Sequence, residues 1–87
     1  MTAKEYCKAF CEGYFYAQLG EKFINGKATD NALDIAKETA QKCIEQQIAY
    51  SGLDEKQKQE MKENFQEWAD TVMQGFKIRL RESGRLI

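Results

Sequence analysis

The sequence predicts an all-α fold, a small three-helix bundle made of a helical hairpin followed by a long C-terminal helix. Three observations predict it. Proline is absent from all 87 residues, apolar residues recur with the helical period, and the pairs Asn25-Gly26, Ser51-Gly52 and Ser83-Gly84 supply the chain's turn signals. Because 87 residues make one domain at most, we expect residues 1–87 to form a single helical domain.

The first helix is predicted to begin at Thr2, because Thr2-Ala3-Lys4-Glu5 matches the S/T-x-x-E capping box. Gly20 marks a candidate break, and Asn25-Gly26 a left-handed helix end. At 100° per residue this helix carries two apolar stripes. The stripe that we expect to face the core comprises Ala3, Tyr6, Cys7, Phe10, Cys11, Tyr14, Ala17 and Ile24. The second stripe comprises Phe15, Leu19 and Phe23, with Tyr16 at its flank.

The second helix is predicted to begin near Thr29, Asp30 or Asn31, all good N-cap residues, and to run to about Tyr50. Its predicted core face is Leu33, Ala36, Ala40, Cys43, Ile44 and Ile48.

The third helix is predicted to begin after Asp54, with Gln57 completing a capping box, and to run to about Glu82. Its predicted core face is Met61, Phe65, Trp68, Ala69, Val72, Met73, Phe76 and Leu80. This helix is the longest, so we expect its end to overhang the others. The competing interpretation is a short extended piece after Gly75, because residues 76–81 also alternate with period two.

The two stripes of the first helix leave two interpretations open. In one, the first helix lies between the other two, and both stripes are buried within one chain. In the other, three helices cover only one stripe, and the surface of Phe15, Tyr16, Leu19 and Phe23 contacts another copy or another protein. Aromatic anchors dominate interface energies, so these four residues are the predicted protein-interaction site.

The chain contains no histidine, which removes the usual general base and the commonest metal ligand. It also lacks a phosphate-binding glycine loop, a nucleophile elbow and a CxxC motif. We therefore expect no enzymatic activity, no metal and no cofactor.

The three cysteines allow three interpretations. Reduced thiols that act as small buried hydrophobes are favoured, because the count is odd and residues 1–5 lack the apolar region of a secretion signal. A disulfide between Cys11 and Cys43, which an antiparallel hairpin would place opposite each other, is the second interpretation. A three-thiolate metal or redox site is the third and the least favoured.

The C-terminal segment is basic although the whole chain carries a net charge of −1. Residues 71–87 contain Lys77, Arg79, Arg81 and Arg85 against Glu82 alone. These four cations are candidate phosphate contacts, but the cluster is small and the body is acidic, so we favour a helix end whose cations complement the backbone carbonyls.

These observations predict a small non-enzymatic domain that acts by stoichiometric binding to a protein, as an inhibitor, an immunity protein or an adaptor. We expect it to form a homodimer through an aromatic helix face, and to reside in the cytoplasm without binding a membrane. In size and helicity the chain is similar to small phage or bacterial inhibitors and immunity proteins, a similarity of class that implies no site. The alternatives are a small nucleic-acid-binding regulator and a processed extracytoplasmic domain stabilised by the Cys11–Cys43 disulfide.

Overall fold

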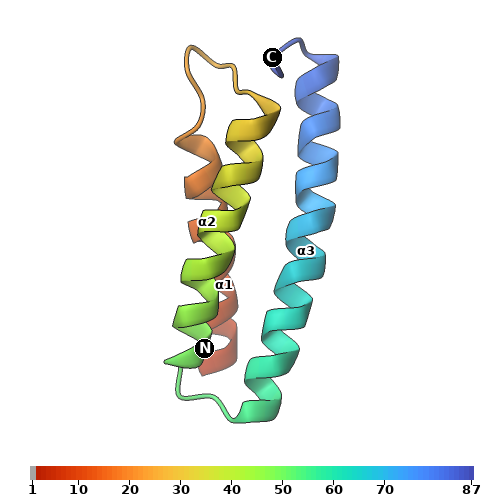
Figure 1. Cartoon of the computed structure of the whole chain (residues 1–87). Helices are drawn as coiled ribbons and strands as arrows, with labels where there is room; N and C mark the ends of the chain where they lie inside the picture. Colours follow the sequence, from red (N-terminus) through yellow and green to blue (C-terminus); the bar gives the residue numbers. More distant parts are fainter. Residues whose placement is uncertain (1) are drawn as a thin grey trace.

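The computed structural model describes residues 2–87, apart from the side chain of Ala3. The predicted core position of Ala3 therefore lies outside the described residues. Within residues 2–87 the chain forms three α-helices and no β-strand: α1 (Ala3–Gly20), α2 (Asp30–Ala49) and α3 (Glu55–Glu82). α1 and α2 form a hairpin, and α3 runs back along it (Figure 1). The predicted all-α class, with a hairpin and a long C-terminal helix, is confirmed.

Each helix begins at a residue whose side chain caps it. The Thr2 hydroxyl accepts a hydrogen bond from the Glu5 amide at 3.1 Å, and the Thr29 hydroxyl accepts one from the Ala32 amide at 3.0 Å. At α3 the capping box is complete, because the Asp54 carboxylate and the Gln57 side chain each accept from the other residue's amide. The three predicted helix starts are confirmed.

α1 ends at Gly20, the predicted break, and the following loop contains a tight turn. Asn25 and Gly26 both have positive φ, of 55° and 78°, as the central residues of a type I′ turn require. The amides of Ile24 and Lys27 each donate to the other's carbonyl, at 2.8 and 3.1 Å. The prediction that Asn25-Gly26 ends a helix is therefore wrong, since this pair turns a miniature hairpin instead.

α3 is continuous through Gly75, so the alternative of an extended piece there is wrong. The helix ends in a Schellman motif: Gly84 has a φ of 73°, and the Arg85 amide donates to the Leu80 carbonyl at 2.8 Å. The chain then turns back toward the α1–α2 loop. The Ala28 amide donates to Arg85, and the Ile87 amide donates to Ala28, both at 3.0 Å. The C-terminal end is thus held against the α1–α2 loop, which covers the end of α3 that was predicted to overhang the other helices (Figure 1).

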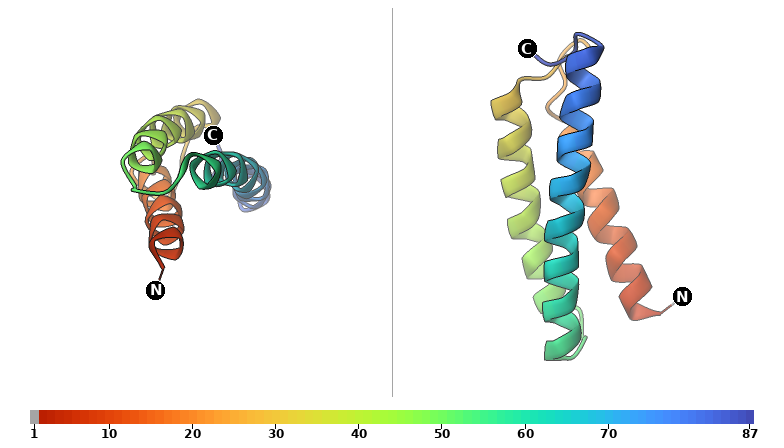
Figure 2. Two further views of the ribbon diagram at one scale, coloured as in Figure 1. Left: turned by 90° about the horizontal axis from the view of Figure 1, so that it is seen from below. Right: turned by 90° about the vertical axis from the view of Figure 1, so that its right-hand side faces the viewer.

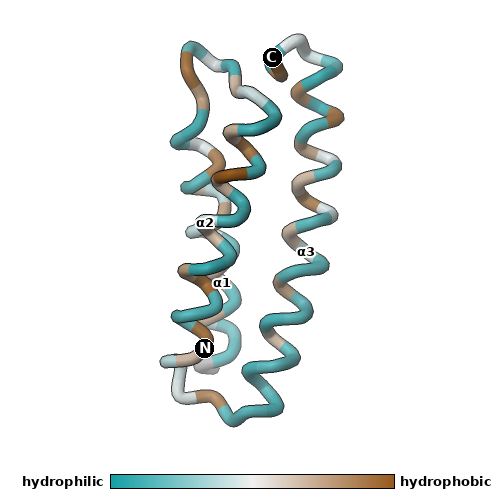
Figure 3. The backbone as a smooth tube through the Cα atoms, in the orientation of Figure 1, coloured by the Kyte–Doolittle hydropathy of each residue, from teal (hydrophilic) through white to brown (hydrophobic). Residues whose placement is uncertain are grey.

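One hydrophobic core extends through all three helices. Apolar positions recur among hydrophilic ones along each helix (Figure 3), which is the pattern of helices that bury one face. The buried residues are Cys7, Cys11, Phe15, Leu19, Ala28, Leu33, Ala36, Ala40, Ile44, Ile48, Met61, Phe65, Ala69, Met73 and Leu80. The predicted core faces of α2 and α3 are confirmed, with Cys43, Trp68, Val72 and Phe76 half-buried at their edges.

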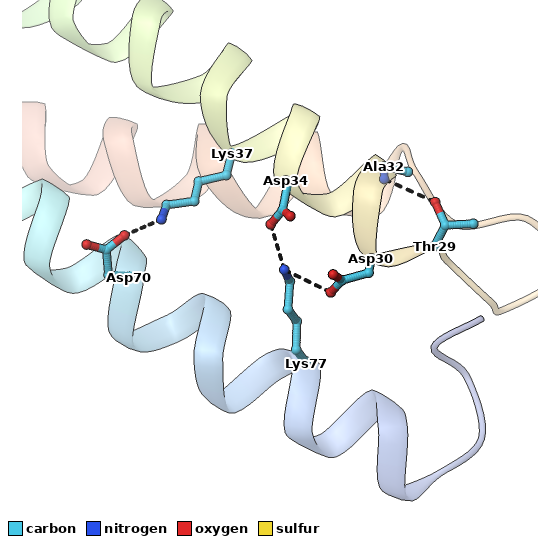
Figure 4. A network of polar contacts seen from close by, with 7 residues as sticks. All are labelled: Thr29, Asp30, Ala32, Asp34, Lys37, Asp70 and Lys77. Carbon is cyan, nitrogen blue, oxygen red and sulfur yellow. Dashed lines mark hydrogen bonds and ion pairs between the residues drawn. The ribbon is translucent and has the colours of Figure 1, made fainter.

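A ladder of ion pairs joins α2 to α3 and fixes their register (Figure 4). The pairs are Lys77–Asp30 at 2.9 Å, Lys77–Asp34 at 2.6 Å, Lys62–Glu45 at 4.0 Å, and Lys37–Asp70. Each step up α2, from Asp30 to Lys37 to Glu45, is matched by an equal step down α3. A slip of the two helices would separate all of these charges together. Because the carboxylates are about half exposed, the ladder contributes to the choice of register more than to stability.

Candidate interaction surface

The core of the structure contains the second apolar stripe of α1, together with Cys7 and Cys11 from the stripe that was predicted to lie there. Phe15 is 0% exposed and Leu19 is 2% exposed, so both are core residues and are not available to a partner. Phe23 is half-buried and packs edge-on against Phe76, with ring centroids 5.9 Å apart. Of the predicted interaction site, only Tyr16 is largely exposed, at 52%.

Aromatic side chains of α3 enclose Phe15. Its ring meets Phe65 and Trp68 edge-on, at centroid distances of 5.9 and 5.4 Å, and the Tyr16 ring also lies edge-on to Trp68, at 5.6 Å. The buried side chains of α1 are Cys7, Cys11, Phe15 and Leu19, spaced by four residues. These residues lie where α1 meets both α2 and α3.

The stripe that was predicted to lie in the core is divided, because Cys7 and Cys11 are buried as predicted whereas its other described members are half-buried or exposed. Tyr6 is 66% exposed, Phe10 is 41% exposed, and Ile24, beyond the helix end, is 75% exposed, so the prediction is wrong for these residues. The Phe10 ring stacks on that of half-buried Tyr14, with centroids 6.1 Å apart and planes inclined by 14°. We call Tyr6, Phe10 and Tyr14, at intervals of four residues on α1, the aromatic strip. Ala17, from the same stripe, is also exposed.

An uncharged hollow of about 490 Å³ adjoins the aromatic strip. It lies between the start of α1 and the end of α2, where Tyr50 is 89% exposed. Its lining residues are Thr2, Tyr6, Cys7, Phe10, Gln47, Tyr50 and Ser51. The strip and the hollow together form a surface on the α1–α2 hairpin that is rich in aromatic side chains and, among the residues that the structure describes, has no charged lining residue.

A second groove, of about 360 Å³, separates α1 from α3, because α1 diverges from α3 toward its amino end (Figure 2, right). Its lining residues are Lys4, Lys8, Cys11, Glu12, Met61, Asn64, Phe65 and Trp68. Three of them are charged, so this groove is amphipathic. It differs in this respect from the hollow beside the aromatic strip.

The three cysteines are free thiols, as the favoured interpretation had it, and the alternative Cys11–Cys43 disulfide is not formed in the structure. Cys11 is 1% exposed and neighbours Cys7 on the same helix. Burial, and secondarily the adjacent Cys7, raises the pKa of the Cys11 thiol from 9.0 to about 12. Cys43 is half-buried and lies against Tyr14, whose pKa is raised by a hydrogen bond with the Cys43 side chain. Cys11 and Cys43 therefore have different neighbours, namely Cys7 beside Cys11 and Tyr14 beside Cys43.

We expect the thiols to react in the order of their exposure. In the folded protein at pH 8, Cys43 reacts with an aromatic disulfide reagent first, whereas Cys11 stays protonated and enclosed. Three thiols titrate in denaturant. Because the folded pKa of Cys11 lies above the unfolded value, its contribution to stability is complete below pH 9 and is lost as the pH rises toward 12. A Cys11→Ala variant is expected to lose this part of the decrease in the free energy of unfolding at alkaline pH. A count of only one thiol in denaturant would mean that two of the cysteines are joined in a disulfide, which would contradict the free-thiol assignment.

Fewer cations of the basic C-terminal cluster are available to a ligand than the sequence indicates, because Lys77 is engaged in ion pairs. The Lys77 ammonium is held between Asp30 and Asp34 (Figure 4). These two hydrogen-bonded carboxylates raise the pKa of Lys77 against the opposing effect of its own desolvation, which is the largest single contribution. Arg79, Arg81 and Arg85 remain exposed.

Comparison with protein-family models, with curated proteins and with solved structures finds no match for this chain. Among residues 2–87, no group of three or more Cys, Asp or Glu side chains is arranged to hold a metal ion. In the same part of the chain no helix has an apolar stretch long enough to cross a bilayer. The surface chemistry of the bundle is therefore the basis for the functional proposal.

Proposed function

We propose that this protein is a small non-enzymatic domain that acts by stoichiometric binding to a protein, through the aromatic strip of α1 and the adjoining Tyr50. Such a domain acts as an inhibitor, an immunity protein or an adaptor, by occupying a surface of its partner. The observation that supports this most strongly is the exposure of Tyr6, Phe10 and Tyr50, at 66%, 41% and 89%, around an uncharged hollow.

The core does not need these side chains. Phe15, Leu19 and their neighbours on α2 and α3 already enclose one another, and within residues 2–87 no buried side-chain nitrogen or oxygen lacks a partner. Large aromatic side chains that a closed core leaves in water are typical of contact surfaces, because a partner that covers them removes their exposed apolar area from solvent. Tyrosine in particular is enriched among the residues that dominate interface energies.

A nucleic-acid-binding regulator, the alternative, has less support. Nucleic-acid modules use a broad basic face, whereas the C-terminal cluster keeps only Arg79, Arg81 and Arg85 once Lys77 is engaged in ion pairs. The disulfide-stabilised extracytoplasmic alternative has less support as well, because all three thiols are free.

Site-specific photocrosslinking tests the proposal. A photoreactive phenylalanine analogue at position 10 is expected to give one discrete adduct with a protein in 1:1 ratio in cells of the native host. The matched control places the analogue at Ile78, which is also about half exposed, at 52%, but lies on α3. A Tyr6→Lys substitution is expected to abolish the adduct at position 10. Equal crosslinking from positions 10 and 78, or an adduct insensitive to Tyr6→Lys, would refute the proposed surface.

A further inference from the structure

A row of small residues lies beside the aromatic strip on α1. Ala9, Gly13 and Ala17, again at intervals of four, are all exposed. A Cβ atom added to Gly13 would meet nothing within 4 Å, so the backbone there is open to another molecule. We call these three residues the small-residue row. At 100° per residue its members lie about 60° around the helix from those of the aromatic strip. The aromatic strip therefore forms a ridge, and the small-residue row forms a groove beside it.

We propose that the partner on this surface is a second copy of the chain, with the two α1 helices packed antiparallel about a two-fold axis. This inference rests on the proposed function, because it names the occupant of the same surface. A two-fold interface uses one patch on both copies, so the patch must be complementary to itself. A ridge beside a groove on one helix meets this requirement, because the ridge of each copy can pack into the groove of the other.

The spacing of the two rows fixes the register of the pair. If Phe10 of one copy faces Gly13 of the other, the antiparallel arrangement also places Tyr6 opposite Ala17 and Tyr14 opposite Ala9. Every aromatic residue then meets a small one, and the symmetry axis passes between positions 11 and 12. On the helical wheel the three facing pairs have a common mean direction, near 250° on a scale of 100° per residue, so they lie along one contact line. Gly13 permits the closest backbone approach where the Phe10 ring lies.

The charges around α1 are compatible with this pairing. Neither row contains an ionisable group other than the tyrosine hydroxyls, so the helices meet without desolvating a charge. Glu21, the C-cap of α1, then lies across from the partner's Thr2, where the free backbone amides of a helix start favour a carboxylate. In a parallel pairing Glu21 would instead face Glu21 of the second copy.

The exposed aromatic side chains supply about half of the area that a standard dimer interface buries. From their exposed fractions of 66%, 41% and 89%, the side chains of Tyr6, Phe10 and Tyr50 present roughly 400 Å² per copy. A standard interface buries about 800 Å² per partner, and the small-residue row and the flanking side chains of α2 supply further area. Ile24 is 75% exposed beyond the carboxyl end of α1, and the antiparallel register brings it toward the partner's hollow at the amino end.

Sedimentation equilibrium of the purified full chain tests the association. The apparent mass is expected to rise from the monomer value of 10.1 kDa toward twice that value as the concentration increases to about 100 μM. Phe10→Lys and Tyr6→Lys are each expected to raise the dissociation constant more than ~100-fold, since both copies lose an aromatic anchor. Ile78→Lys, at a similarly exposed position on α3, is expected to leave it unchanged. A mass of 10.1 kDa at 1 mM, or dissociation by Ile78→Lys alone, would overturn the inference.

Mixing two single variants tests the register. A Tyr6→Lys chain and an Ala17→Glu chain each form a weakened homodimer, but together they form a heterodimer with one Lys–Glu pair and one native pair. We expect this mixture to associate at least ~10-fold more tightly than either variant alone. In this register the lysine introduced at position 6 does not face position 9 of the other chain, so a mixture of Tyr6→Lys with Ala9→Glu is expected to associate no more tightly than either variant alone. An equal gain in affinity from both mixtures would overturn the proposed register. If the purified chain is a monomer while position 10 still crosslinks to a different protein in cells, the second-copy inference fails and the proposed function stands.

Discussion

Phe15→Ala is expected to destabilise the protein by about 3 to 5 kcal/mol, because it removes a ring that is completely enclosed and leaves a cavity behind. Phe65 and Trp68 lose their edge-on partner in the same step. A small domain has a total stability of about 5 to 15 kcal/mol, so the loss is a large fraction of the whole. Urea denaturation followed by circular dichroism at low micromolar concentration measures it.

Phe10→Ala is the matched control, since it removes the same side chain from the other stripe of the same helix. Phe10 is 41% exposed, and we expect its replacement to cost less than about 1 kcal/mol in the monomer. If the Phe15→Ala chain does not fold, Phe15→Leu provides a milder comparison, with an expected cost below ~2 kcal/mol. Equal costs at positions 10 and 15 would contradict the assignment of the two stripes.

Ala40→Leu is expected to produce the second-largest loss, of about 1 to 3 kcal/mol. Ala36, Ala40 and Ala69 are all 0% exposed, so the helices approach where the side chains are smallest. Three added carbon atoms at position 40 must displace a neighbouring helix or adopt a strained rotamer. Thermal unfolding measures the change.

Ala49→Leu is the control for this substitution. Ala49 is exposed at the last residue of α2, so the same three carbon atoms enter solvent there and the melting temperature is expected to stay within a few degrees. A stable Ala40→Leu variant would mean that α2 is not packed as closely as the structure indicates.

The sequence was sufficient to predict the three helices and most of their ends. Thr2, Thr29 and Asp54 are local capping signals, and their effect depends on the next three residues rather than on the rest of the fold. The core faces of α2 and α3 were also predictable, because each helix has one apolar stripe and therefore one way to turn it inward.

The orientation of α1 was not predictable by the same reasoning. A helix with apolar residues on two sides satisfies the helical pattern in either orientation, so periodicity alone does not choose between Phe10 and Phe15. The choice depends on the shapes of α2 and α3, where Phe65 and Trp68 provide an aromatic pocket for a ring at position 15. In the wider stripe three helices cover Cys7 and Cys11 but leave Tyr6 and Phe10 exposed.

The C-terminal residues illustrate a second limit of sequence reasoning. Leu86 and Ala28 are 58 positions apart in the chain, and no local pattern indicates that they meet in a β-bridge. The Schellman turn at Gly84 was signalled by the Ser83-Gly84 pair, but the direction of the chain after it was not. The end of α3 therefore appeared free in the sequence although it closes the top of the bundle.

On α1 the side of Phe15 and Leu19 is buried within one chain, and we propose that the exposed side of Tyr6 and Phe10 meets a partner. NMR line broadening by a soluble paramagnetic agent tests it most directly, when the aromatic rings are observed in dilute protein and again in concentrated protein. The account predicts that Phe15 is protected at both concentrations, whereas Tyr6 and Phe10 are broadened in dilute protein and become protected as the concentration rises. Broadening of Phe15 in dilute protein, or protection of Tyr6 and Phe10 there, would contradict it.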